Sequence, residues 1–244
     1  MPDAISLGVG EPDFDTPWRV REEGIYSLER GRTFYTSNAG LKELRYEISE
    51  YLERKYELVY DPNHEIIVTV GGSEGIDIAM RTILDPGDEV IVVQPCFVSY
   101  VACVVMAGGI PVIVSLKEED KFKLKKEQLE AAVTDKTKAM IISFPNNPTG
   151  AIMTKEELEP IAEFAKEHDI VVISDEIYSE LYLWKRSRQY RILARDERQI
   201  DRDQWIFQGI CNDWMETWLC CSTKVHDETD GQGSSVLYHG STDD

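Results

Sequence analysis

The stretches KAMIISFPNNPTG, residues 138–150, and IVVISDEIY, residues 170–178, decide the fold of this chain. Each is a short, continuous apolar run rich in β-branched residues, and each stops at Pro, Asn or Asp. Three similar runs precede them, namely EIIVTV at 65–70, DEVIVV at 88–93 and IPVIVSL at 110–116. Strands that are apolar throughout and that alternate with helical stretches indicate a mainly parallel sheet buried on both faces. We therefore predict an α/β fold in which helices flank a parallel sheet.

The chain divides into three parts by pattern. Residues 1–40 are rich in turn formers and hold one short helix at 20–31, and residues 41–183 carry the alternating strands and helices. Residues 184–244 show little apolar periodicity and contain four of the five tryptophans. At the start of the middle part, LKELRYEISEYLERKY predicts an amphipathic helix that packs on a core. Its apolar face consists of Leu41, Leu44, Ile48, Tyr51 and Leu52.

Composition excludes several classes of function. With 244 residues, 42% apolar and 29% charged, the chain has the composition of a soluble globular protein. It has no apolar run of roughly 20 residues and its start does not resemble a signal peptide, so we expect a cytoplasmic protein that does not bind membranes. The net charge of −19 argues against nucleic-acid binding. The five cysteines show no metal-ligand spacing, which favours reduced thiols and no metal site.

A phosphate site is predicted where the first strand meets the following helix. Gly71 and Gly72 let the backbone approach a ligand closely, and Ser73 and Glu74 open the helix. The free N–H groups and the positive end of the helix dipole there favour a phosphate dianion. Glycine between a strand and a helix also occurs for purely geometric reasons, so this signal alone is weak.

Polar and aromatic side chains follow the next strands at the same predicted edge. Phe97 and Tyr100 offer an aromatic face on which a planar ring could stack, although core packing explains them equally well. In PNNPTG the side chain of Asn147 can donate a hydrogen bond to a ring oxygen, and a plain turn is the alternative.

Asp175 ends the last strand, and Tyr178 follows three residues later. A carboxylate at this edge needs a positive partner, such as a protonated pyridine nitrogen, unless Asp175 merely caps a helix. Tyr178 can donate to a phenolic oxygen on the same ring.

The order of these signals resembles the class I and II aminotransferases, in particular the aspartate and aromatic aminotransferases of fold type I, which depend on pyridoxal 5'-phosphate. The resemblance extends from Ile5 to about Tyr182. Its blocks are SLGVGEPDFDTP, YTSNAGLKELR, VTVGGSEGID, FPNNPTG and ISDEIY. It implies that residues 41–183 are an incomplete cofactor-binding large domain and that the chain is incomplete at both ends.

The resemblance assigns roles to the edge residues. The backbone near Gly72, Ser73 and Glu74 is expected to hold the cofactor phosphate. Three side chains are expected to contact the ring: Phe97 by stacking, and Asn147 and Tyr178 at the phenolic oxygen. Asp175 is expected to keep the ring nitrogen protonated, which makes the ring an electron sink.

Two further residues are assigned in the same way. Tyr35 is expected to reach the phosphate bound by a partner subunit, and Gly10 to lie beside the substrate carboxylate. Both imply a homodimer that transfers an amino group from an amino acid to a 2-oxo acid.

The family's next block, in which a serine and two residues precede the Schiff-base lysine, is absent. After residue 178 the only lysines are Lys185 and Lys224, and neither stands in such a block. The tail can be explained as the family sequence read in the wrong frame. With permitted codons, QWIFQGICNDWMETW at 204–218 gives NGFSKAYAMTGWRL when read one base later. We therefore predict a frame slip near Leu183 and a poorly ordered tail, the alternative being a genuine divergent domain.

Three hypotheses follow for function. The first is an aminotransferase by family, and the second is a related fold type I enzyme such as a carbon–sulfur lyase. The third is an inactive fragment that binds pyridoxal phosphate weakly and without a covalent bond. For the chain as it stands, which lacks the lysine, inactivity is expected.

Overall fold

The structure, a computed structural model, describes residues 15–179 and the backbone of two further strands at 206–212 and 217–221. It divides into two units, residues 1–37 and residues 38–244. The first unit contains helix α1 (Trp18–Glu29), in which no residue is buried. Its large side chains are therefore exposed, with Trp18 at 61% and Leu28 at 68%.

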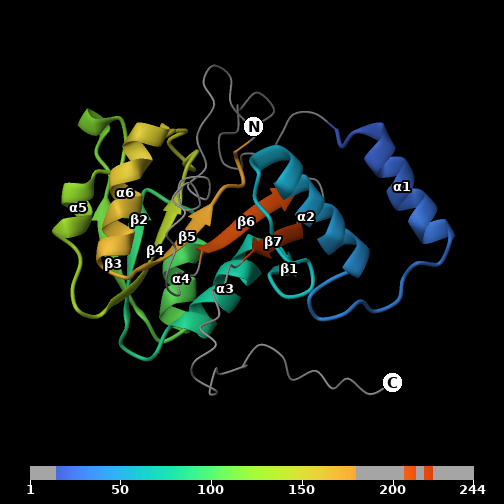
Figure 1. The fold of residues 1–244 in the computed structure, drawn as a ribbon, viewed down its shortest axis with the longest axis horizontal. Coiled ribbons are helices and arrows are strands. Elements are labelled where there is room, and N and C mark those ends of the chain that lie inside the picture. Colours follow the sequence, from blue (N-terminus) through green and yellow to red (C-terminus); the bar gives the residue numbers. More distant parts are fainter. Residues whose placement is uncertain (1–14, 180–205, 213–216, 222–244) are drawn as a thin grey trace, which may run out of the picture. The chain divides into compact units, whose positions relative to one another are not determined.

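A seven-stranded sheet forms the centre of the second unit (Figure 1). The strands are β1 (Ile66–Val70), β2 (Glu89–Gln94), β3 (Ile110–Ser115), β4 (Thr137–Ser143), β5 (Val171–Asp175), β6 (Ile206–Asn212) and β7 (Thr217–Cys221). Their order across the sheet is β1-β7-β6-β5-β4-β2-β3. Neighbouring strands from β6 to β3 are parallel, and only β7 runs the other way. The predicted α/β fold with a mainly parallel sheet is confirmed.

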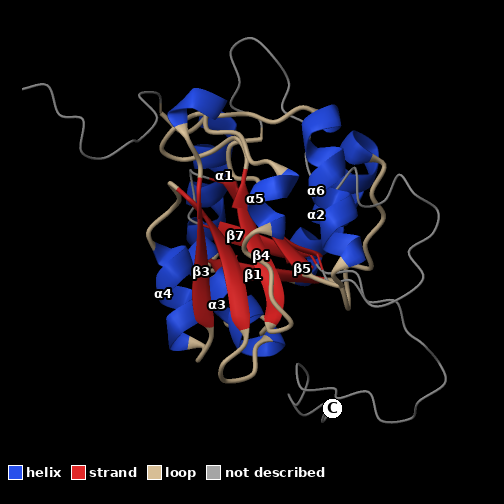
Figure 2. Ribbon diagram, turned by 90° about the vertical axis from the view of Figure 1, so that its left-hand side faces the viewer, coloured by secondary structure: helices blue, strands red, loops and turns tan. Residues whose placement is uncertain are grey.

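Helices cover both faces of the sheet (Figure 2). They are α2 (Lys42–Tyr56), α3 (Gly72–Ile83), α4 (Ser99–Met106), α5 (Lys126–Glu130) and α6 (Lys155–Glu167), and a short 3-10 helix spans Glu118–Asp120. Side chains of α5 and α6 share one buried cluster with Ile91, Met140, Ile142 and Val172. Side chains of α3 and α4 share another with Val90, Val92, Ile141 and Ile173. The strands therefore alternate their apolar side chains between the two faces, as burial on both sides requires.

Local sequence explains where several helices begin and end. Thr154 and Glu157 form a capping box at the start of α6, in which each side chain satisfies a backbone N–H of the other. After α2, Glu57 adopts the left-handed conformation. The Glu57 N–H donates to the Glu53 carbonyl oxygen, and the next N–H, that of Leu58, donates to the Leu52 carbonyl oxygen. Of the apolar face predicted for α2, Leu52 is fully buried and Ile48 and Tyr51 pack beside it. Leu41 and Leu44 are instead 50% and 38% exposed.

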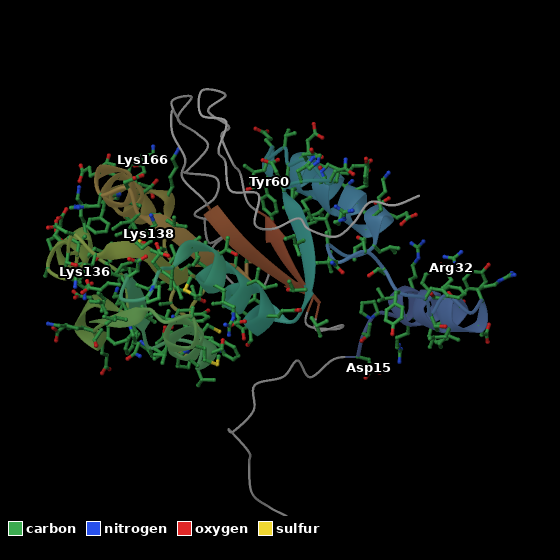
Figure 3. All side chains as sticks on the ribbon, turned by 90° about the horizontal axis from the view of Figure 1, so that it is seen from below. Asp15, Arg32, Tyr60, Lys136, Lys138 and Lys166 are labelled. Carbon is green, nitrogen blue, oxygen red and sulfur yellow. The ribbon has the colours of Figure 1, made fainter. Side chains whose placement is uncertain are left out.

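Within the described residues, no helix is both long enough and apolar enough to cross a membrane. The two described cysteine side chains, Cys96 and Cys103, are free thiols, and burial raises the pKa of both. Three lysines, Lys136, Lys138 and Lys166, lie on one side of the second unit (Figure 3). The first two flank Thr137, at the end of β4 opposite Ser143.

The tail contributes two strands to the sheet. β6 pairs with β5, and β7 lies between β6 and β1. The remainder of residues 184–244 lies outside the described residues, as do Gly10 and the first residues of the chain. Whether this tail is read out of frame stays a prediction.

Candidate functional site

The carboxyl ends of four strands meet at one edge of the sheet. β2, β4 and β5 are mutually parallel, and β1 runs in the same direction because two antiparallel pairings, through β7, connect it to β6. Two glycines follow β1, Phe97 follows β2, Asn146 and Asn147 follow β4, and Asp175 ends β5. Ligands of open parallel sheets bind at such an edge. The sequence segments predicted to hold functional residues are therefore brought together here.

The start of α3 lies after β1 at this edge. Gly71 precedes the helix at φ +80°, a conformation that glycine adopts without strain. No side chain caps this helix end, and Gly72 is buried while Ser73 and Glu74 are exposed. The Glu74 carboxylate accepts a hydrogen bond from the Val70 N–H at 2.5 Å. The first turn of a 12-residue helix thus presents backbone N–H groups where a phosphate is predicted.

The turn after β4 is organised by Asn146. This side chain is 5% exposed, donates to the Pro95 carbonyl oxygen at 3.0 Å and accepts from the Thr149 hydroxyl at 2.7 Å. These bonds tie the turn to the segment that follows β2. The adjacent Asn147 donates from Nδ2 to the Tyr178 hydroxyl at 3.3 Å. The two side chains predicted to share one ligand oxygen are thus already neighbours.

Asp175 is a buried carboxylate at the end of β5, with 4% of its surface exposed. Its Oδ1 accepts from the Ile177 N–H at 3.1 Å, and its Oδ2 accepts from the Tyr100 hydroxyl at 2.5 Å. Tyr100 is 1% exposed. Burial, followed by the charge of Asp175 and the hydrogen bond to it, raises the pKa of Tyr100 well above its ordinary value. Tyr100 therefore remains a hydrogen-bond donor at neutral pH.

Phe97 and Tyr100 do not form a common stacking face. The Phe97 side chain is 40% exposed, and its ring lies 6.0 Å from the Tyr100 ring at an interplanar angle of 69°. Phe97 is thus open to a ligand, whereas Tyr100 belongs to the core that α3 and α4 form with the sheet. For Tyr100, core packing is the correct alternative.

The bond between Tyr100 and Asp175 is the feature that the sequence did not reveal. The residues are 75 positions apart, and the Ser143 side chain is also hydrogen-bonded to Tyr100. Ser143 and Asp175 are register partners on β4 and β5. The one available signal was a tyrosine, which carries a polar tip, among otherwise apolar residues of a buried helix.

Two further predicted site residues are Tyr35 and Gly10. Tyr35 belongs to the first unit, and its side chain is fully exposed. Gly10 lies outside the described residues. Their expected roles stay predictions.

A second group of titratable side chains lies on α5 and α6. Glu130, Glu167 and His168 bring their ligand atoms within 4.8 Å of one another. The Lys126 ammonium lies 2.6 Å from Glu167 and 3.9 Å from Glu130, so it already compensates these exposed carboxylates. Exposed ion pairs of this kind are common on protein surfaces.

Comparison with known proteins agrees with this geometry. A family model described as aminotransferase class I and II matches residues 2–201. A Bacillus subtilis protein, YugH, whose name assigns it provisionally to the aminotransferases, is 58% identical over 74% of this chain and 47% of its own length. The aspartate aminotransferase of Pyrococcus abyssi is 46% identical over 80% of this chain and 50% of its own length.

Solved structures agree as well. The crystal structure of an aromatic aminotransferase from Pyrococcus horikoshii superimposes with a TM-score of 0.81 at 40% identity, over 91% of this chain and 59% of that one. The chain thus spans about half the length of the relatives it matches in sequence.

Proposed function

The chain belongs to the class I and II aminotransferase family, and we propose that it forms the cofactor-binding part of an enzyme that transfers an amino group from an amino acid to a 2-oxo acid. Members of this family depend on pyridoxal 5'-phosphate, and the fold is that of fold type I aminotransferases. The predicted fold, family and cofactor are therefore confirmed at the level of the family.

One observation carries the proposal. The hydrogen bond between Asn147 and Tyr178 at 3.3 Å lies at the same edge as the buried Asp175 carboxylate and the start of α3. Pyridoxal phosphate has a phenolic oxygen, a basic ring nitrogen and a phosphate. The edge offers two donors, one buried acceptor and a helix N-terminus, so its chemistry fits all three groups of the cofactor.

Each residue then has a physical task. Gly72, Ser73 and Glu74 would hold the phosphate through backbone N–H groups, and the Phe97 ring, which is 40% exposed, would be available for stacking on the cofactor ring. Asn147 and Tyr178 orient the ring by donating to its oxygen.

Asp175 accounts for the chemistry of the ring. It holds a proton on the ring nitrogen, because a buried carboxylate pairs favourably with a positive charge. When bound, pyridoxal phosphate supplies an electron sink for the substrate's α-carbon.

Two proposed roles remain, those of Tyr35 and Gly10. We propose that Tyr35 contacts the phosphate bound by a partner subunit of a homodimer and that Gly10 lies beside the substrate carboxylate. The enzyme would then act in the cytoplasm on small amino and oxo acids.

A second candidate follows from the lysines. Lys185 and Lys224 are the only lysines after Tyr178, and neither lies in the expected block. The chain as it stands then binds the cofactor without a covalent bond and is inactive, because the missing lysine is also the general acid and base of the proton transfer.

The first experiment compares the chain of this sequence with one in which the reading frame is restored near Leu183. Each is incubated with pyridoxal 5'-phosphate, reduced with borohydride and examined by peptide mass spectrometry. We expect an adduct only in the restored chain, on the lysine encoded across the codons of Gln208 and Gly209. An adduct at Lys185 or Lys224 of the unrestored chain, together with aminotransferase activity, would contradict the inactive alternative.

A binding measurement tests the site itself. Pyridoxamine 5'-phosphate needs no lysine, so its affinity can be measured with the unrestored chain by fluorescence titration. Asn147→Ala should weaken it on the order of fivefold to tenfold, because one hydrogen bond is lost. Asn63→Ala, in the exposed loop before β1, is the matched control and should change nothing. Equal affinities for all three chains would remove Asn147 from the site.

A further inference from the structure

The Asp175 carboxylate accepts a hydrogen bond from Tyr100, a residue to which the proposed function gives no contact with the cofactor. Tyr100 comes from α4, on the sheet face that Asp175 also faces, and donates to Oδ2 at 2.5 Å. The Ile177 N–H donates to Oδ1 at 3.1 Å. Two donors on different oxygens fix the plane of the carboxylate, since each oxygen is bound by a group with its own anchored position.

Tyr100 is itself fixed. Its ring is 1% exposed within the cluster of α3, α4 and the sheet. Ser143, the register partner of Asp175, is hydrogen-bonded to the Tyr100 side chain. Three residues from α4, β4 and β5 therefore form a chain of hydrogen bonds, Ser143 to Tyr100 to Asp175, in a region where unpaired polar groups are costly.

From this arrangement we propose that Tyr100 is a positioning residue, which orients the Asp175 carboxylate and keeps it ionised toward the ring nitrogen of the cofactor, with Ser143 supporting it. The inference rests on the proposed function. Tyr100 does not touch the cofactor in this role and acts only through Asp175. A hydrogen bond to an ionised acceptor is among the stronger ones, and it favours the charged form of a buried acid.

Other groups near Asp175 are neutral or are hydrogen-bonded to other side chains. Cys96, just before α4, interacts electrostatically with Tyr100, and burial raises the pKa of its thiol, so it is neutral. Glu176 is bonded to Ser174, which points to the other face of the sheet. Tyr178 is bonded to Asn147.

The test uses the full chain and two probes that differ at one atom. One is pyridoxamine 5'-phosphate, and the other is its 1-deaza analogue, in which carbon replaces the ring nitrogen. Tyr100→Phe keeps the ring and removes only the hydroxyl. It should weaken binding of pyridoxamine 5'-phosphate on the order of tenfold and binding of the deaza analogue less than about twofold. An equal loss for both probes would make Tyr100 merely structural and overturn the proposal.

The control is Tyr60→Phe. Tyr60, labelled in Figure 3, is 3% exposed. It packs in a separate cluster with Leu52, Leu58 and Ile66. It matches Tyr100 in burial, and its variant should leave both affinities unchanged. If Tyr100→Phe does not fold, Ser143→Ala serves instead, because it removes the support of Tyr100 and should show the same selectivity between probes with a smaller loss of about threefold.

A second measurement separates this inference from the proposed function. The unfolding equilibrium without ligand is measured for Tyr100→Phe, Asp175→Asn and the double variant. If Tyr100 and Asp175 are directly coupled, the unfolding constant of the double variant should differ about tenfold from the product of the two single effects. In the control cycle, which combines Tyr60→Phe with Asp175→Asn, the two effects should simply multiply. A multiplicative cycle at Tyr100 overturns the inference. Coupling without binding of either probe supports the contact and counts against the proposed function.

Discussion

The two faces of the sheet are formed by the same strands but bury different kinds of side chain. On the face of α5 and α6, Met140, Ile142 and Val172 pack against helix residues such as Phe164. On the face of α3 and α4, the strands end in Ser143 and Asp175, which reach Tyr100. Adjacent residues such as Ile142 and Ser143 therefore serve different purposes, because successive side chains of a strand point to opposite faces.

This difference indicates a division of labour. The face of α5 and α6 supplies packing, which depends on volume and tolerates no cavity. The face of α3 and α4 supplies packing near its middle and a polar network at the edge where a ligand is proposed to bind. A substitution on the first face should then act mainly on stability, whereas one at the edge of the second should act mainly on binding.

The largest effect is expected at Phe164, which is fully buried in α6. Phe164→Ala removes a whole ring and should lower the free energy of unfolding by about 3–5 kcal/mol, measured by urea denaturation. Val105→Ala, at a side chain that is 57% exposed on α4, is the control and should cost no more than about 0.5 kcal/mol. A cost below about 1 kcal/mol at Phe164 would break the comparison.

Asp175→Asn should show the opposite behaviour. The amide keeps one oxygen as an acceptor, so the free energy of unfolding should change by less than about 1.5 kcal/mol. The negative charge is lost, and the affinity for pyridoxamine 5'-phosphate should fall on the order of a hundredfold in a fluorescence titration. Unchanged affinity together with a large loss of stability would mean that Asp175 is a structural residue.

A matched pair of methyl deletions sharpens the comparison. Ile141 and Ile142 are adjacent on β4, both at most 2% exposed, and they face different clusters. Ile141→Val and Ile142→Val should each cost about 0.5–1.5 kcal/mol in thermal unfolding. Neither should change cofactor affinity, since both lie before the edge. A tenfold effect of Ile141→Val on binding would show that the site extends into the core.

The smallest effect is expected at the first turn of α6, where Glu157 is paired with Lys123. Burial tends to raise the pKa of Glu157, but hydrogen bonds from Lys123 and from the Thr154 N–H outweigh it and hold this pKa below the ordinary 4.5. A lowered pKa in the folded state adds stability above pH 4.5 that is lost as the pH falls below it.

Lys123→Met should therefore cost less than about 1 kcal/mol at pH 7, because both side chains are about a third exposed, and the difference should shrink below pH 4.5. Lys138→Met, at an exposed lysine near the start of β4, is the control and should not change the pH profile of unfolding (Figure 3). If the loss at Lys123 does not shrink as the pH is lowered, the ion pair is not its cause.

Much of the fold could be predicted from local pattern. All five predicted strands form. Their continuous apolar runs place apolar side chains on both faces of the sheet, so both faces must be covered by helices. The pairing of Asn147 with Tyr178 could be anticipated, since both follow parallel strands and such ends meet at one edge. The burial of Leu41 and Leu44 was predicted wrongly, because periodicity specifies a helix face without specifying what covers it.

The sequence by itself determined the layered α/β fold, the family and the edge at which the polar residues gather. The periodicity of apolar residues and the residue types at the strand ends are local properties of the chain, and these predict all three. Only the tertiary structure decided that Tyr100 is a partner of Asp175 rather than a stacking ring. That contact joins residues 75 positions apart, and it depends on how α4 is oriented over β4 and β5. Helix orientation over a sheet is set by packing of many side chains at once, so no short stretch of sequence encodes it.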